Sequence, residues 1–291
     1  MKPFPIPVVP ADLPLGPGAH TEEEHLDYLP MPRDMDTYRA PVLPEPEDIS
    51  DYPAVRALMG QVLSALHAAS QGSAGCSIPV DDLTERERQL IDQLLGEGEV
   101  SALVRELTPG VELRAQESIF AGIWRVRLWQ GERLRSDQIE IGPLPAALLV
   151  TAQEDGQARY RPWVGALPPN VQNAPMLVEE VLDQVQRWQP QQPAHVINLS
   201  LLPVTPEDIG YLDHQIGTGR VLMLSRGYGN CRISSTRLPH CWRVIYYNSM
   251  EKVILNTVEV VGVPEVALAA PEDMVDSHVR LLDILQYLEL A

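Results

Sequence analysis

The sequence predicts an α+β fold built from two tandem copies of one α/β repeat. Each copy is expected to hold a helix, a strand, a second helix and then a mixed-sheet meander. The main observation is an internal duplication: residues 83–100 resemble residues 204–221, and residues 124–126 resemble residues 242–244. The chain of 291 residues, 45% of them apolar, is also long enough to bury one large core or two ordinary ones.

Residues 1–50 are expected to form a Pro-rich extended tail. Proline fixes its own φ and lacks a backbone donor, so this stretch suits neither a helix interior nor a sheet. Residues 29–38 mix apolar and charged side chains and could dock on a surface groove. Disorder fits the same composition equally well.

The first repeat is expected over residues 51–151. Apolar residues at helical spacing predict its first helix, and a strand follows at residues 76–80. Thr84, with Glu87 three positions on, predicts the start of the second helix, and Gly96 predicts its end. Further strands are expected at residues 100–104, 119–129 and 138–141.

A linker at residues 152–174, with three prolines, permits either one continuous sheet or two lobes. The second repeat then covers residues 175–291, with strands expected at 195–202, 220–225, 241–247 and 253–261. Thr205 and Gly217 should bound its second helix. A capping helix at residues 274–290 is expected to pack on this second copy.

Bulk charge and missing motifs exclude several classes of function. A net charge of −18 disfavours nucleic acid as a partner. The chain has no apolar run long enough for a membrane span, and its start is too proline-rich for a secretory signal, so we expect a cytoplasmic protein.

The three cysteines have no CxxC spacing, and the histidines form no zinc motif. Glycines 96 and 98 follow a helix instead of preceding one, which argues against a phosphate loop. We therefore expect no metal site, no cofactor and no enzymatic activity.

The remaining candidates are residues for partner binding. Period-two alternation places Trp124 and Trp242 on one strand face and Arg125 and Arg243 on the other, so the tryptophans are either core anchors or interface residues. Tyr228 lies in the predicted hairpin turn 227–230. Acidic residues that could attract a basic partner form two groups: Glu97 and Glu99 in the first repeat, and Glu265, Glu272, Asp273 and Asp276 near the end. The second repeat has Thr218 and Arg220 where the first has Glu97 and Glu99, so the two loops should not be equivalent.

Several segments together resemble the HupH/HyaF family of hydrogenase expression/formation proteins. They include residues 94–101, 117–127, 197–199, 227–229, 264–266 and 269–277. The resemblance implies an accessory role in maturing an uptake nickel–iron hydrogenase. Such a protein would bind the small-subunit precursor during iron–sulfur cluster assembly, before export, and could also bind other maturation proteins. The alternatives are a metal or iron–sulfur carrier in the same pathway and, less favoured, a small-molecule enzyme with a pocket between the repeats.

Overall fold

The computed structural model describes residue 49 and residues 51–227 and 229–288. The expected tail at residues 1–50 lies almost entirely outside this part of the chain, as does Tyr228. Within the described ranges no helix combines the length and the apolarity that a membrane crossing requires.

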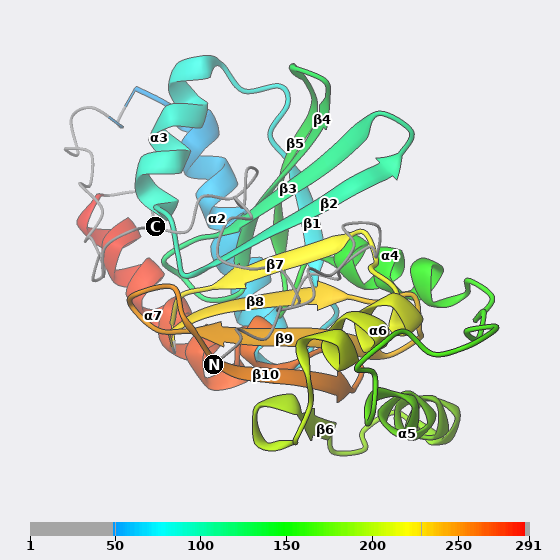
Figure 1. The fold of residues 1–291 in the computed structure, drawn as a ribbon. Coiled ribbons are helices and arrows are strands. Elements are labelled where there is room, and N and C mark those ends of the chain that lie inside the picture. The colour runs from blue at the N-terminus through cyan, green and yellow to red at the C-terminus, as the bar shows by residue number, and fades with distance from the viewer. Residues whose placement is uncertain (1–48, 50, 228, 289–291) are drawn as a thin grey trace.

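Ten strands form one continuous sheet, which answers the question left open by the linker (Figure 1). The α+β class is thus confirmed. The strand order is β1-β5-β4-β3-β2-β7-β8-β9-β10-β6. The first five strands are β1 (Cys76–Pro79), β2 (Val100–Thr108), β3 (Val111–Glu117), β4 (Ile123–Gln130) and β5 (Arg133–Ile141). The other five are β6 (His195–Asn198), β7 (Val221–Ser225), β8 (Asn230–Ser235), β9 (Cys241–Tyr247) and β10 (Val253–Val260).

The two halves meet at the antiparallel pair of β2 and β7, which lies at the centre of the strand order. Ala102 pairs with Met223, and Val100 and Val104 pair with Ser225 and Val221. Read outward from this seam, both halves have the same strand order: the four strands of the meander in chain order, and then the short strand that precedes them in the chain.

The prediction of a mixed sheet is wrong, because all neighbouring strands in the described sheet are antiparallel. A strand–helix–strand unit gives a parallel pair only if the two strands become neighbours. Here β1 pairs with β5, and β6 pairs with β10, so each short strand lies on an outer edge of the sheet.

Helices surround this sheet. They are α2 (Pro53–Ser70), α3 (Glu85–Leu95), α4 (Ala146–Gly156), α5 (Ala174–Arg187), α6 (Pro206–Ile216) and α7 (Pro271–Tyr287), with short 3-10 turns η1 (Leu199–Leu201) and η2 (Glu265–Ala267). The predicted starts of α3 and α6 are confirmed. Thr84 and Thr205 each form a capping box with the acidic residue three positions on.

Alternation along the strands divides the sheet into two faces. Trp124 and Trp242 point to one face, where they join an apolar cluster with Leu148 of α4; we call this the α4 face. Arg125 and Arg243 point to the other, the α3/α6 face, where they meet Asp92 of α3 and Asp213 of α6. In Figure 1, α3 and α6 lie at opposite corners of the sheet.

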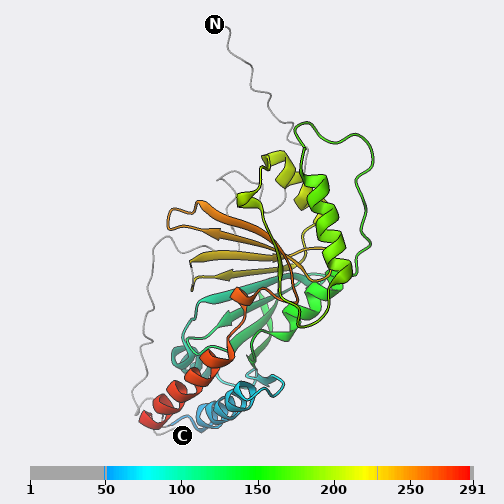
Figure 2. The same ribbon diagram turned by 90° about the horizontal axis from the view of Figure 1, so that it is seen from below.

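The expectation that the C-terminal helix packs on the second half is wrong. Helix α7 packs on α2 of the first half. Its Met274, Leu281 and Leu285 belong to the apolar cluster of α2 and α3. Figure 2 shows α2 and α7 side by side, at the end of the molecule away from α5. Helix α4, which follows β5 of the first half, contacts β2 of its own half and also β7 of the second. Its last residue lies against the second half, because a Cβ on Gly156 would lie 2.6 Å from Pro239 Cα.

Candidate functional site

The loop between α3 and β2 carries the first predicted acidic group. Helix α3 ends at Gly96, whose φ of 57° favours glycine. The Gly98 N–H then donates to the Glu117 carbonyl at 2.7 Å, and a Cβ at residue 98 would lie 2.1 Å from the Ser118 carbonyl oxygen. Glycine is therefore required where the loop crosses β3. Glu97 and Glu99, on either side, are exposed.

Glu99 lies against the turn between β7 and β8 in the second half. The Arg226 N–H donates to the Glu99 carbonyl at 3.1 Å. The Glu99 carboxylate occupies the space that a side chain at Gly227 would take. The predicted turn residue Tyr228 lies outside the described residues.

Glu117, at the end of β3, is a site residue that was not singled out from the sequence. Its side chain is only 7% exposed, and the Gly122 N–H donates to its Oε1 at 3.4 Å. Burial raises the pKa of Glu117 to about 7, against that hydrogen bond, and the negative charges of Glu99 and Asp273 add to the rise. Glu117 therefore links one residue from each predicted acidic group.

The second acidic group surrounds the start of α7. Glu265 lies in η2, and Glu272, Asp273 and Asp276 lie in the first two turns of α7; all four are exposed. The turn at residues 118–122 holds α7 in place. The Ala121 N–H donates to Ser277 Oγ at 2.8 Å, and Arg280 stacks over Phe120 at 5.5 Å. This packing brings Asp273 within electrostatic reach of Glu117.

The corresponding loop of the second half has a different chemistry. Arg220 stands where the first half has Glu99, and the Arg105 N–H donates to its carbonyl at 3.1 Å. The Arg220 guanidinium is bound by Asp155 at 2.7 Å and by Glu154 at 2.8 Å, both from α4. One loop thus presents carboxylates, whereas the other is closed by an internal ion pair.

Four predicted binding residues are internal, which corrects the interpretation of them as interface residues. Trp124 is fully buried and donates from Nε1 to the Gly142 carbonyl at 3.0 Å, whereas Trp242 donates to Val261 and Gly262. They are the core anchors of the alternative interpretation.

The arginines on the other face of the same strands form internal ion pairs. Arg125 pairs with Asp137 at 2.7 Å, and Arg243 pairs with Asp213 at 2.7 Å. A buried arginine requires such partners, since an unpaired charge inside the fold is costly.

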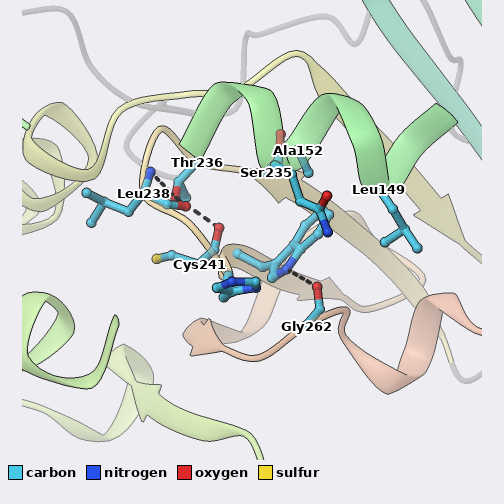
Figure 3. A pocket seen from close by; sticks show the side chains of 10 residues that line it. Leu149, Ala152, Ser235, Thr236, Leu238, Cys241 and Gly262 are labelled. Atoms are coloured by element: carbon cyan, nitrogen blue, oxygen red, sulfur yellow. Dashed lines mark hydrogen bonds between the residues drawn. The ribbon is translucent and has the colours of Figure 1, made fainter. Parts of the chain in front are cut away.

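Two cysteines and a small cavity of the described residues are possible sites of chemistry, and neither favours catalysis or metal binding. Burial raises the pKa of Cys231 and of Cys241 to about 12, so both thiols stay protonated at neutral pH and are poor nucleophiles and ligands. A cavity of about 20 Å³ lies beside Cys241, between α4 and the second half (Figure 3). It has room for about one water molecule. No group of three or more potential metal ligands gathers anywhere in the described ranges.

Comparison with known proteins places the chain in a family. The model of the HupH hydrogenase expression protein, C-terminal conserved region, matches twice, at residues 54–163 and 171–288. The hydrogenase expression/formation protein HoxQ of Cupriavidus necator is 46% identical over 292 residues, covering 99% of both chains. HupH of Rhodobacter capsulatus is 42% identical over 93% of this chain and 94% of its own.

More distant relatives match as well. The hydrogenase-1 operon protein HyaF of Escherichia coli is 34% identical over 95% of this chain and 96% of its own. A solved structure of the hydrogenase expression protein HupH from Thiobacillus denitrificans is 27% identical and covers 39% of this chain and 95% of that one, with a TM-score of 0.37. The family model and the full-length relatives agree: the chain belongs to the HupH family of hydrogenase expression/formation proteins.

Proposed function

We propose that this protein is a cytoplasmic, non-enzymatic accessory factor in the maturation of an uptake nickel–iron hydrogenase. In this proposal it binds the small-subunit precursor while the iron–sulfur clusters are assembled and before export. Family membership supports a role in hydrogenase expression or formation. The precursor as the partner is our inference, and it extends to other maturation proteins of the same pathway.

The observation that carries the proposal is the acidic surface around Glu117. Glu99 from the α3–β2 loop and Asp273 from α7 lie within electrostatic reach of the same buried carboxyl group. A basic segment of the precursor would be attracted by these charges and by the net charge of −18, mainly through faster association. The corresponding loop of the second half offers no such surface, since Arg220 already pairs with Glu154 and Asp155.

The test is a pull-down from hydrogenase-producing cells at low and high salt, with metal analysis of the eluate. The proposal expects the precursor to be recovered at low salt and lost at high salt, because exposed charges are screened. The double variant Glu97→Lys/Glu99→Lys should lose most of the precursor. The control variant Glu132→Lys/Glu179→Lys makes the same change in net charge at exposed positions elsewhere and should retain it.

Two results would contradict the proposal. Undiminished recovery with Glu97→Lys/Glu99→Lys would exclude this surface. Stoichiometric iron or nickel on this chain without the precursor would favour a metal or iron–sulfur carrier.

We also propose that the chain arose as two tandem repeats, at residues 51–151 and 175–291, joined by residues 152–174. Support comes from the equal strand order on both sides of the β2–β7 seam and from the family model, which matches the chain twice. The ion pairs Arg125–Asp92 and Arg243–Asp213 join corresponding strands and helices in the two halves.

A further inference from the structure

The central part of the α3/α6 face differs from its two ends. Asp92 of α3 reaches Arg127 on β4, and Asp213 of α6 reaches Arg243 on β9. Four strands, β3, β2, β7 and β8, lie between these border strands. At about 4.8 Å per strand, they form a strip of roughly 15–20 Å between the borders. We call this part of the sheet the central strip.

The side chains of the central strip follow from strand alternation. Ala102, Val104, Val221 and Met223 belong to the apolar cluster on the α4 face. Their neighbours Leu103, Leu222 and Leu224 therefore point to the α3/α6 face. Leu103 pairs with Leu222 across the β2–β7 seam, so that the strip has an apolar centre.

Two of these leucines are buried beside Leu222 on the α3/α6 face. Leu103 is 1% exposed and Leu224 is 5% exposed. Neither belongs to any of the three apolar clusters formed by residue 49 and residues 51–227 and 229–288. Burial of this kind is what a further segment lying across the strip would produce.

The flanks of the strip carry positive side chains. Arg114 on β3 and Arg232 on β8 alternate with members of the α4-face cluster, so both point to the α3/α6 face. Glu112, on the same face of β3, pairs with Arg114 at 2.5 Å, and the Arg114 side chain is still 57% exposed. A segment suited to this surface combines apolar side chains for the leucines with carboxylates for the arginines.

The first 48 residues of the chain have this composition. They contain ten Asp or Glu residues against three Lys or Arg residues. Apolar residues are interspersed with these carboxylates, as at Leu26, Tyr28, Leu29 and Met31. The segment joins the described fold at Ile49, which is 1% exposed and packs in the cluster of α2 and α3. An extended chain covers about 3.3 Å per residue, so about 20 residues reach some 60 Å from this anchor.

We propose that the acidic N-terminal segment, within residues 1–48, binds across the central strip as an intramolecular strap. Its apolar residues cover the leucines of the seam, and its carboxylates face Arg114 and Arg232. Its prolines suit this mode of binding, because an extended segment that lies on side chains needs no ladder hydrogen bonds from every residue.

The test uses the full-length protein with a photoreactive amino acid in place of Leu222. Irradiation is expected to yield a product of monomer size in which residue 222 is joined to a peptide from residues 1–48. The control places the same group at Ile254, which is 60% exposed on β10, outside the strip. It should give severalfold less of the tail product, which separates specific docking from random collision.

Gln116, on the same face of β3, is a second position for the photoreactive group, in case the variant at Leu222 does not fold. Products from both strip positions that lie only within residues 49–291 would overturn the proposal. So would products of dimer size, which would mean that a second copy occupies the strip, or equal tail yields at residues 222 and 254.

Discussion

Asp155 binds Arg220 twice. Its Oδ2 accepts the Arg220 backbone N–H at 2.6 Å, and its Oδ1 accepts the guanidinium Nε at 2.7 Å. The guanidinium also donates to the carbonyls of Glu106 and Leu107 at the end of β2. The Arg220 side chain thus connects the start of β7 to α4 and to the end of β2, both in the first half.

Replacing Arg220 by Gln should therefore lower the free energy of unfolding by about 1–2 kcal/mol, since charge-assisted hydrogen bonds to a partly exposed group are lost. Arg187→Gln is the matched control. It should cost about 0.5 kcal/mol or less, because Arg187 forms an exposed helix pair with Asp183. Urea denaturation of both variants measures the difference. Equal losses would show that the Arg220 contacts do not hold the halves together.

The two buried arginines should tolerate loss of a carboxylate differently. Arg125 has Asp137 at 2.7 Å and Asp92 at 3.8 Å, whereas the ion pair of Arg243 is with Asp213. Asp213→Ala should cost about 3–5 kcal/mol, because it leaves a buried guanidinium with the neutral acceptors of Asn256 and Thr257 in place of a carboxylate. Asp92→Ala should cost much less, since Asp137 remains. Thermal or chemical unfolding of the two variants decides this, and a smaller loss for Asp213→Ala would contradict it.

The capping residues of α3 and α6 should also contribute unequally to the free energy of unfolding. Glu87 caps only its own helix, whereas Asp208 Oδ1 accepts N–H groups from Gln172, Asn173 and Ala174 at the start of α5. Although burial opposes the change, these hydrogen bonds and one from Thr205 lower the pKa of Asp208. Asp208→Asn should thus destabilise by about 1–3 kcal/mol, and by more than Glu87→Gln, as measured by urea denaturation.

The pH dependence supplies an independent check on Asp208. A depressed pKa contributes stability above the unfolded-state pKa, and this contribution is lost as the pH falls through the folded-state pKa. Asp208→Asn should therefore flatten the acid limb of the unfolding profile. An unchanged acid limb would show that the carboxylate is not held as described.

Glu117 should give stability the opposite pH dependence from Asp208. Its pKa of about 7 in the folded protein exceeds the ordinary value of 4.5, so the folded state binds the proton more tightly. The resulting stability is complete below pH 4.5, declines as the pH rises, and is lost once the pH passes 7. The loss amounts to at most about 3 kcal/mol.

Glu117→Gln should therefore be less sensitive to pH between 5 and 8 than the parent protein, as measured by urea denaturation at several pH values. Glu259→Gln is a useful comparison, because burial also raises the pKa of Glu259, but on β10, away from the acidic surface. Lowering the charge nearby with Glu99→Gln should move the Glu117 transition to lower pH. A transition that stays in place would show that the two carboxyl groups are not coupled.

Local signals in the sequence predicted local structure well. The Thr-x-x-acid pattern and the following glycine identified the bounds of α3 and α6, because capping depends on neighbouring residues. Helix α4 was missed because it buries only Leu148 and Thr151 and has little apolar periodicity. Strand β3 was missed as well, although its last residue, Glu117, proved to be central to the site.

Long-range contacts were beyond the reach of the sequence. Both acidic groups were predicted, but their convergence on Glu117 depends on α7 crossing to the first half, which no pattern within α7 reveals. The alternation of Trp124 and Arg125 was read correctly as two faces. Whether a face is covered depends on Asp92 and Asp137, which lie 33 residues before and 12 residues after Arg125 and reach it only after folding.

The exchange of α4 and α7 has a consequence for how the protein behaves as a whole. Each half lends a helix to the other, and the seam of β2 and β7 closes an edge that either half alone would expose to aggregation. A cut in the linker should therefore not release two autonomous modules. The described fold should instead melt as a single cooperative unit, and a fragment of either half should need its missing counterpart, supplied in trans, to stay in solution.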